Sequence, residues 1–173
     1  NGNPQDSSGK GNHGILDGAT WTKGKSGGVL IFDGVDDYVL LKDNEGMENI
    51  SGLSVEAWVN PKDTSKDYMG VVDKGWNGGY IMDIHQGNPR FQIQTATGEF
   101  IIADSELNIS TDKWYHLAGV YNGSNAFIYI NGTLRRTSSN SGVMGDSNLD
   151  MYVGGDGTST FYFNGAIDEI AVY

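Results

Sequence analysis

Apolar and polar residues along this chain alternate or form short blocks, and no stretch shows the apolar spacing of an amphipathic helix. Glycine, asparagine and aspartate bound the apolar blocks, which is typical of strands joined by tight turns. The pattern predicts about a dozen strands, with the sequences GVLIF, DYVLLK, LSVEAWVN, MGVVDK, YIMDIH, RFQIQT, EFIIAD, WYHLAGVY, AFIYIN, TLRRTS, DMYVGG and GAIDEIAVY. Strands of this length and spacing predict an all-β fold, a sandwich of two antiparallel sheets.

The clearest local prediction is a three-strand meander over residues 121–137, YNGSNAFIYINGTLRRT. Asn131–Gly132 is a strong signal for a two-residue hairpin turn between the second and third strands. Within the second strand, Phe127 and Tyr129 face one side, and the isoleucines that alternate with them face the other. Because both faces are apolar, this strand is expected to be covered on both sides or to line a cleft.

Residues 1–27 differ from the rest, since the stretch NGNPQDSSGKGNHG is almost free of apolar side chains. This composition predicts an extended, glycine-rich segment laid over the surface, with Trp21 fixing its end to the core. No repeat or linker interrupts the sequence, so residues 1–173 are expected to form a single domain. The abrupt beginning and the strand-like end favour a domain of a longer protein.

The chain is acidic, with 11 Lys and Arg against 22 Asp and Glu, a net charge of −11 and a pI near 4.4. Such a charge argues against binding to nucleic acid or to anionic membranes, which requires clustered basic side chains. The chain has no Cys, which excludes disulfides, a thiol nucleophile and thiolate zinc sites. No signal peptide or hydrophobic span is visible, and the acidity suits an extracellular protein that binds cations or neutral ligands.

Several stretches in order carry a family resemblance: DSSGKGNHGIL leading into FDGVDDYV, then LSVEAWVNP, KWYHLAGVYNGSNAFIYING and FNGAIDEIAVY. Together they resemble the bacterial and archaeal laminin G-like, concanavalin A-like jelly-roll domains over essentially the whole chain. The resemblance implies two curved antiparallel sheets with adjacent termini and a calcium ion near the rim. It also implies an accessory module of a secreted or cell-surface protein that binds carbohydrate or protein. The fold alone does not decide function, because lectins, enzymes and adhesive modules share it.

The stretch FDGVDDYV crowds three aspartates, Asp33, Asp36 and Asp37. A tight turn explains Asp33–Gly34, whereas unpaired carboxylates this close raise one another's pKa and cost stability. Calcium prefers six to eight oxygen ligands, and the resemblance implies a calcium-binding aspartate on the last strand, here Asp168. We therefore expect a structural calcium held by Asp33, Gly34 through its carbonyl, Asp36 and Asp168. The alternative is a set of solvated turn aspartates and a surface acid pair.

Glycans are bound by aromatic faces that stack on sugar rings and by planar polar side chains that hold hydroxyl groups. The stretch DKGWNGGYIMD and the strand after it offer this mixture. The expected ligand-binding residues are Trp76, Tyr80, Asp83, Arg90, Gln92 and Gln94. The last three share one strand face, which indicates a polar stripe on an exposed concave face. The competing interpretation is that Trp76 packs on glycine-rich backbone and that the glutamines merely face solvent. Four other aromatic residues are expected in the core: Trp58, Trp114, Tyr115 and Phe127.

Two other segments offer weaker candidate sites. The N-terminal DSSGKGNHG lacks the acidic residue that closes an EF-hand loop, so a metal is not expected at its candidate ligands Asp6, Ser8 and Asn12. The loop GGDGTSTFYFNG is a candidate for a rim site or a second metal, through Asp156, Phe161 and Tyr162.

The sequence does not favour an enzyme. Retaining glycosidases of this fold use a strand of the pattern Glu-x-Asp-x-x-Glu, and no stretch here matches it. Asp168 and Glu169 are adjacent on a strand and point to opposite faces, so they cannot flank one bond. A jelly-roll polysaccharide lyase would require Tyr121 and His85, in WYHLAGVYNG and DIHQG, as its acid and base. The arginine-rich strand of such lyases is missing, and an acidic chain suits a polyanionic substrate poorly.

These observations favour a non-catalytic, calcium-containing binding module of a larger secreted or cell-surface protein, with a polysaccharide or glycan as its partner. The alternative is a structural or adhesion spacer that contacts another protein. A polysaccharide lyase or glycoside hydrolase is the least favoured interpretation.

Overall fold

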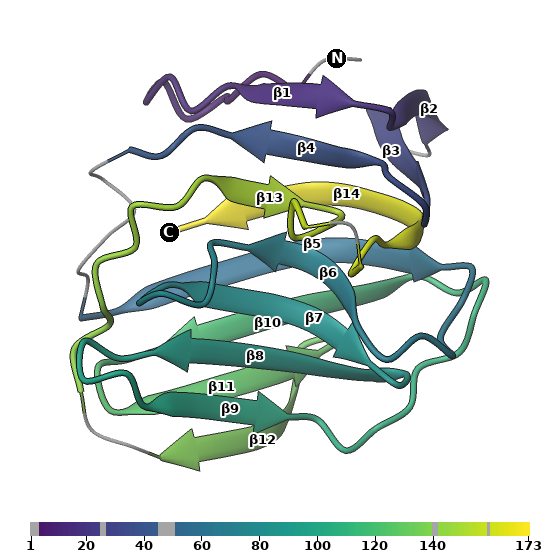
Figure 1. The fold of residues 1–173 in the computed structure, drawn as a ribbon. Coiled ribbons are helices and arrows are strands. Elements are labelled where there is room, and N and C mark those ends of the chain that lie inside the picture. Colours follow the sequence, from purple (N-terminus) through teal and green to yellow (C-terminus); the bar gives the residue numbers. More distant parts are fainter. Residues whose placement is uncertain (1–3, 25–26, 45–50, 140–141, 159) are drawn as a thin grey trace.

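The computed structural model describes residues 4–24, 27–44, 51–139, 142–158 and 160–173, and its regular elements in these ranges are all β-strands. They form two seven-stranded antiparallel sheets packed face to face (Figure 1). The predicted all-β, two-sheet jelly-roll sandwich is therefore confirmed. In the same ranges, no helix is long and apolar enough to cross a membrane.

Sheet A has the strand order β1-β4-β13-β6-β7-β8-β9. Its strands are β1 (Gly14–Asp17), β4 (Tyr38–Leu41), β13 (Met151–Val153), β6 (Met69–Asp73), β7 (Tyr80–His85), β8 (Asn88–Gln94) and β9 (Phe100–Asp104). Sheet B has the order β12-β11-β10-β5-β14-β3-β2. Its strands are β12 (Thr133–Ser139), β11 (Asn125–Ile130), β10 (Tyr115–Tyr121), β5 (Leu53–Pro61), β14 (Asn164–Val172), β3 (Gly27–Asp33) and β2 (Thr20–Gly24). Every stretch predicted as a strand forms one.

The N-terminal segment adds an edge strand to each sheet. β1 pairs with β4 in sheet A, and β2 pairs with β3 in sheet B. The sequence predicted only an extended segment here, because GILD and TWTKG are short and contain few apolar residues. Trp21 packs against the core, as predicted. Residues 1–3 and 25–26 of the expected segment lie outside the described residues.

Strand β5 shows how the core forms. In a two-sheet sandwich, each strand turns every second side chain toward the other sheet. The inward side chains of β5 are at most 3% exposed, and they are Leu53, Val55, Ala57 and Val59. Burial of each larger aliphatic side chain stabilises the fold by about 1.5–3 kcal/mol. The side chains between them, including Trp58, lie on the outer face of sheet B.

The prediction that Trp58, Trp114 and Phe127 lie in the core is therefore wrong. Trp58 is 37% exposed and Trp114 is 39% exposed. Phe127 is half-buried on the outer face, because its neighbour Ile128 fills the core. Tyr115 is partly buried and does pack against the core. Hydrophobicity alone favoured the core for all of them, whereas the alternation of the strand decides which way each side chain points.

The predicted meander is present as β10, β11 and β12. Asn131 and Gly132 have φ angles of 51° and 74°, the left-handed values that a two-residue type I′ turn requires. Strand β11 packs its isoleucines into the core, while Phe127 and Tyr129 remain half-buried outside. Strand β11 is therefore covered on one face only.

Three of the expected ligand-binding residues form a buried network on the outer face of sheet A. Arg90 donates two hydrogen bonds to the Asp83 carboxylate, from Nε to Oδ1 at 2.9 Å and from Nη2 to Oδ2 at 2.6 Å. Gln92 Nε2 donates to Asp83 Oδ2 at 2.8 Å. All three residues are at most 7% exposed, and Arg90 lies over the ring of Tyr68. Buried charges need such partners, so these groups bind one another, which corrects the expectation that they contact a ligand.

Tyr80 also has a structural position. It points inward from β7 together with Met82 and is fully buried. Its hydroxyl donates to Met151 Sδ at 3.4 Å. The expectation that Tyr80 contacts a ligand is wrong because the alternation of β7 sends this side chain into the core.

Asp73, the last residue of β6, is a second buried carboxyl group of sheet A, and it is 5% exposed. Burial raises the pKa of Asp73 from 3.8 to about 7. A hydrogen bond from Gly75 N to Asp73 Oδ1, at 2.6 Å, opposes this rise in pKa, and the charges of Asp156 and Asp83 add to it. Below about pH 7 the folded protein therefore favours the protonated form of this side chain.

Asp73→Asn should reduce a loss of stability that accompanies rising pH. Because the folded pKa exceeds the unfolded value, the folded state binds the additional proton, and stability falls as pH rises from about 4 to about 7. One pKa unit corresponds to about 1.4 kcal/mol, so this contribution is at most about 4 kcal/mol. Urea unfolding at about pH 4 and about pH 7.5 measures it, and the wild type should lose more stability across this interval than Asp73→Asn. An equal pH dependence in both proteins would contradict the raised pKa.

Candidate functional site

An exposed aromatic pair lies on the outer face of sheet A. Trp76 is in the turn between β6 and β7, Phe100 begins β9, and each is 43% exposed. Their ring centroids are 5.4 Å apart in an edge-to-face arrangement. The two rings pack against Ile81, Gln92, Gln94 and glycine residues, which leave no open cavity beside them. A sugar ring can stack on such a surface. The sequence singled out Trp76 but missed Phe100, although the alternation of EFIIAD places Phe100 on the outer face.

Gln94 holds the Trp76 turn in place. Its Oε1 accepts a hydrogen bond from Gly78 N at 2.8 Å, and its Nε2 donates to Gly98 O at 3.3 Å. Gly78 has a φ of 88°, and a side chain there would collide with the backbone of Gly145. Gln94 therefore positions the turn, while its half-buried side chain lies beside Trp76 and Phe100, so its contact with a ligand stays a prediction.

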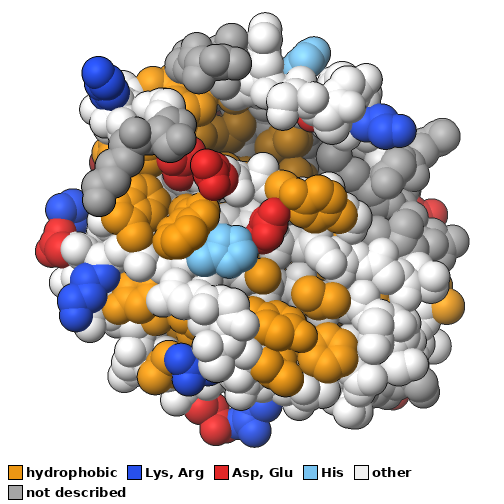
Figure 2. All heavy atoms as spheres, turned by 180° about the vertical axis from the view of Figure 1, so that it is seen from behind, with side chains coloured by type: hydrophobic (Ala, Val, Ile, Leu, Met, Phe, Trp, Pro, Cys, Tyr) orange, Lys and Arg blue, Asp and Glu red, His pale blue; other side chains and the backbone are white. Residues whose placement is uncertain are grey.

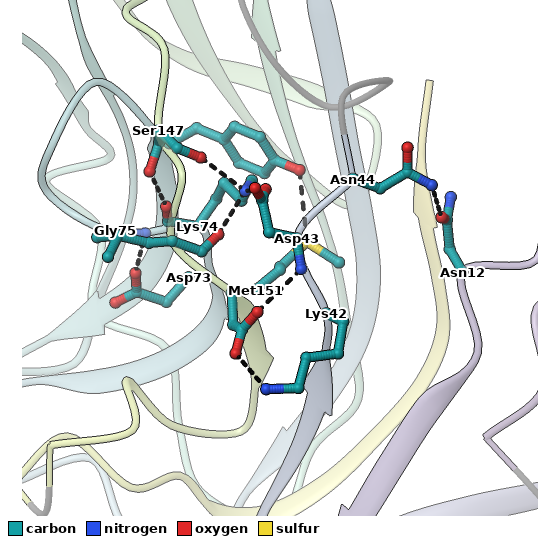
Figure 3. Close-up of polar contacts among 12 residues, drawn as sticks. Asn12, Lys42, Asp43, Asn44, Asp73, Lys74, Gly75, Ser147 and Met151 are labelled. Carbon is teal, nitrogen blue, oxygen red and sulfur yellow. Dashed lines mark hydrogen bonds and ion pairs between the residues drawn. The ribbon is translucent and has the colours of Figure 1, made fainter.

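A buried lysine fixes the other side of this turn (Figure 3). Lys74 Nζ donates to the carbonyls of Ser147, at 2.9 Å, and of Leu149, and it pairs with Asp43 at 2.5 Å. Ser147 Oγ donates to Lys74 O at 2.9 Å. These bonds join the segment after β4, the Trp76 turn and the segment before β13. Since the turn is already ordered, ligand binding there has a lower entropic cost.

The aspartates of FDGVDDYV do lie together. Carboxylate oxygens of Asp33, Asp36 and Asp37 are all within 4.8 Å of one another, and we call these residues the acidic triad. Asp37 is 7% exposed, and its Oδ2 accepts a hydrogen bond from Asp33 N at 2.8 Å. Burial raises the pKa of Asp37, the hydrogen bond from Asp33 N opposes the rise, and the charges of Asp33 and Asp36 add to it. Asp33 Oδ1 accepts from Val35 N and so closes the turn.

Two of the expected calcium ligands do not join the acidic triad. Strands β14 and β3 pair so that Asn164 lies opposite Asp33, and Asp168 is four positions further along β14. At about 3.3 Å per residue, this register separates the backbones of Asp33 and Asp168 by about 13 Å. The Gly34 carbonyl accepts a hydrogen bond from Lys66 Nζ at 2.6 Å, so it already has a cationic partner. The sequence placed the first and last strands near one another but could not fix their register.

The acidic triad fits a divalent cation in part. Its carboxylates supply the charge and some of the oxygen ligands that calcium prefers. Asp36 is exposed, and no described residue donates a hydrogen bond to its carboxylate. Waters would have to complete the coordination, because the Gly34 carbonyl binds Lys66.

The N-terminal candidate Asp6 is a turn acceptor. Its Oδ1 accepts from Ser8 N, and its Oδ2 accepts from Ser8 Oγ and from Asn12 N. These hydrogen bonds lower the pKa of Asp6 to about 2. The carboxylate therefore remains ionised and closes the loop, and turn chemistry accounts for all three residues.

The loop between β13 and β14 is likewise explained by packing. Asp156 accepts hydrogen bonds from the backbone N and the hydroxyl of Thr158. Phe161 packs edge-on against Tyr68, with ring centroids 5.0 Å apart, and Tyr162 is 8% exposed. These residues cover part of sheet A and do not form an open rim site.

The outer face of sheet B also carries hydrophobic side chains (Figure 2), and Trp58 is one of them. The rings of Trp58 and His116 lie 5.3 Å apart, and His116 Nε2 is 3.3 Å from Glu56 Oε2. The Tyr173 hydroxyl donates to Glu56 Oε1 at 3.0 Å. Figure 2 shows a histidine on this face with hydrophobic and acidic side chains beside it. The alternation of LSVEAWVN could have located this surface, because Trp58 is out of phase with the buried residues of β5.

His85 and Tyr121 do not form a catalytic pair. His85 stacks on Tyr68 on the outer side of sheet A, with ring centroids 4.7 Å apart. Tyr121 belongs to sheet B, is 1% exposed, and donates its hydroxyl hydrogen bond to Gly142 O. An acid and a base must both reach one substrate, and this arrangement separates them.

Solved structures share this fold. The binding domain of Paraclostridial Mosquitocidal Protein 1 superposes with a TM-score of 0.79 at 18% identity, over 98% of this chain and 45% of that chain. Domain 4 of a GH43 extracellular arabinanase from Geobacillus stearothermophilus, in complex with arabinotriose, superposes with a TM-score of 0.73 at 20% identity. The match covers 99% of this chain and 86% of that chain. The binding domain of Botulinum Neurotoxin DC in complex with SialylT superposes with a TM-score of 0.73 at 16% identity. The match covers 97% of this chain and 44% of that chain. The chain thus spans less than half the length of these two toxin domains.

Sequence comparison gives a more limited result. Among curated proteins, no significant match was found. A laminin G-type family model, described as the concanavalin A-like lectin/glucanases superfamily, matches residues 33–173. This range includes most of both sheets and the acidic triad. The family match and the two-sheet fold agree, and the chain belongs to the concanavalin A-like lectin/glucanases superfamily.

Proposed function

We propose that this domain is a non-catalytic glycan-binding module and that Trp76 and Phe100 form its binding surface. The observation that carries the proposal is an exposed aromatic pair on a turn held by buried hydrogen bonds. A sugar ring stacks on Trp76, and the exposed Asn77 and Asp146 beside the turn hold its hydroxyl groups. The similarity to an arabinanase domain in complex with arabinotriose supports a glycan as the ligand.

We further propose that the domain belongs to a larger secreted or cell-surface protein. The similar solved domains are parts of an extracellular arabinanase and of toxins, which supports this setting. Separation of His85 from Tyr121 supports binding without turnover. The domain then brings its parent protein to a saccharide surface.

Trp76→Ala should weaken glycan binding by about ten- to a hundredfold, because stacking on an exposed aromatic ring contributes roughly 1–3 kcal/mol. Isothermal titration calorimetry with arabinotriose, cellotriose and xylotriose measures the affinity. The melting temperature should change little, since Trp76 is 43% exposed.

Ile102→Ala is the matched control, because Ile102 is an exposed apolar residue of the same β9 face as Phe100. It should leave the affinity within about twofold of wild type. An unchanged glycan affinity in Trp76→Ala would show that the glycan does not bind at Trp76. Absence of binding to any of a broad set of oligosaccharides would favour the protein-contacting spacer.

We also propose that the acidic triad binds a structural calcium ion. Support comes from three carboxylates within 4.8 Å, one of which is almost fully buried. A bound divalent cation would offset the repulsion among Asp33, Asp36 and Asp37. The ligand set differs from the sequence expectation in that Asp37 replaces Gly34 and Asp168.

Calcium should raise the melting temperature of the domain relative to chelator. A ligand at a hundred times its dissociation constant stabilises the native state by about 2.7 kcal/mol, or roughly 5–10 °C for a chain of this length. Asp36→Asn should abolish this response, because it removes a ligand charge and no hydrogen bond to the carboxylate. Asp168→Asn is the control and should keep the response. An identical melting temperature in chelator and in calcium, together with no calcium in elemental analysis of the purified protein, would show that the acidic triad binds no calcium and that its aspartates only form the turn.

A further inference from the structure

A hollow of about 630 Å³ lies on the outer face of sheet B, on the opposite sheet from Trp76. Its volume is in the range of small-molecule sites. The residues around it come from four strands and two loops. They are Lys23, Gly24, Val29, Ile31, Phe32, Asp33, Asn60, Lys62, Trp114, Asn164, Gly165 and Ala166.

Small residues of β14 create this hollow. Ala166 lies between Asn60 on β5 and Ile31 on β3, so a methyl group separates two longer side chains. A Cβ at the preceding Gly165 would lie 2.2 Å from Asn60 O, so no larger residue fits there. Tyr115 lies opposite Val59, and continuing this register places Trp114 beside Asn60. The hollow therefore has a low floor and a tryptophan wall that the sheet register fixes.

Asn60 provides an acceptor without a donor. Its Oδ1 is buried, and no residue in the described part of the chain donates a hydrogen bond to it. Buried acceptors are normally paired, and each exception requires an explanation. Because this oxygen has almost no exposed surface in the free protein, the Asn60 side chain has to rotate toward the hollow before a ligand there can donate a hydrogen bond to it. An entirely apolar ligand would leave it unpaired.

The remaining groups narrow the class of ligand. Trp114 is 39% exposed and offers a flat apolar wall. Lys23 and Lys62 contribute hydrogen-bond donors at the rim, although Lys62 Nζ also pairs with Asp112, and Asp33 contributes an acceptor. A flat apolar wall with both donors and acceptors matches a sugar ring, which has apolar C–H faces and a girdle of hydroxyl groups.

We propose that this hollow is a second saccharide subsite, in which a sugar ring stacks on Trp114 and one of its hydroxyls donates to Asn60 Oδ1. The proposal shares its ligand class with the proposed function, but it depends on separate residues in the other sheet. Either site can therefore fail while the other remains.

The four tryptophan indole N–H resonances distinguish the two sites in one experiment, because the chain has only Trp21, Trp58, Trp76 and Trp114. Two-dimensional proton–nitrogen NMR with ¹⁵N-labelled protein is recorded while arabinotriose, cellotriose or trigalacturonate is added. At least one of these probes should shift the Trp114 resonance in a saturable way. Trp76→Ala should leave that shift and its midpoint unchanged.

Three variants test the hollow itself. Ala166→Leu fills the floor and should abolish the saturable shift of Trp114. In a protein that already carries Trp76→Ala, Trp114→Ala should lower the affinity for the same sugar at least about tenfold, as measured by calorimetry. Asn60→Ala should also weaken binding at least about tenfold but leave the melting temperature unchanged, because Oδ1 has no donor to lose.

The outcomes separate the two proposals. Shifts confined to Trp76, or no shift with any probe, would overturn the subsite in the hollow. A Trp114 shift that survives Ala166→Leu would also overturn it, because the sugar would then bind elsewhere on the sheet B face. If Ala166→Leu does not fold, the Trp114→Ala and Asn60→Ala affinities decide the question.

Discussion

The whole structure depends on one constraint of a two-layer sandwich, that each strand can bury only one of its faces between the sheets. The inward positions are apolar and nearly inaccessible, as in β5 and β7. The outward positions are free of that demand, and the two sheets use them differently. Sheet A covers part of its outer face with the loop before β14 and pairs Asp83 with Arg90 beneath it. Sheet B leaves Trp58 and Trp114 exposed. The candidate binding surfaces are therefore consequences of which outward residues have no cover.

The strands could be predicted because a strand that faces the core has an apolar residue at every second position, and this alternation is visible in the sequence. All the stretches predicted as strands are present, and Asn131–Gly132 forms the expected turn with φ angles of 51° and 74°. The edge strands β1 and β2 were missed because GILD and TWTKG are short and contain few apolar residues. The other two edge strands, β9 and β12, were predicted, because EFIIAD is apolar and a clear turn precedes TLRRTS.

The candidate sites were less predictable because they depend on register and on the partners of each polar group. Residue type indicated Trp76, which is exposed because it lies in a turn, and its role in ligand binding stays a prediction. The polar residues near it in sequence, Asp83, Arg90 and Gln92, proved to satisfy one another, and a buried pair of this kind cannot be distinguished from a binding site by spacing alone. The distance between Asp33 and Asp168 likewise follows from the pairing of Asn164 with Asp33. Nothing in the local sequence determines that register.

The proposed calcium and hollow sites share one residue, and this has a thermodynamic consequence. Asp33 belongs to the acidic triad and also lines the hollow of sheet B. Its Oδ1 closes the turn through Val35 N, so a ligand at Asp33 acts on a side chain whose orientation is already constrained. A cation at the acidic triad would neutralise the negative charge of Asp33 at the rim of the hollow, where Lys23 and Lys62 also lie. By linkage, any change that calcium makes in sugar affinity equals the change that the sugar makes in calcium affinity. A single strand end would thus connect the stability of the domain with one of its binding surfaces.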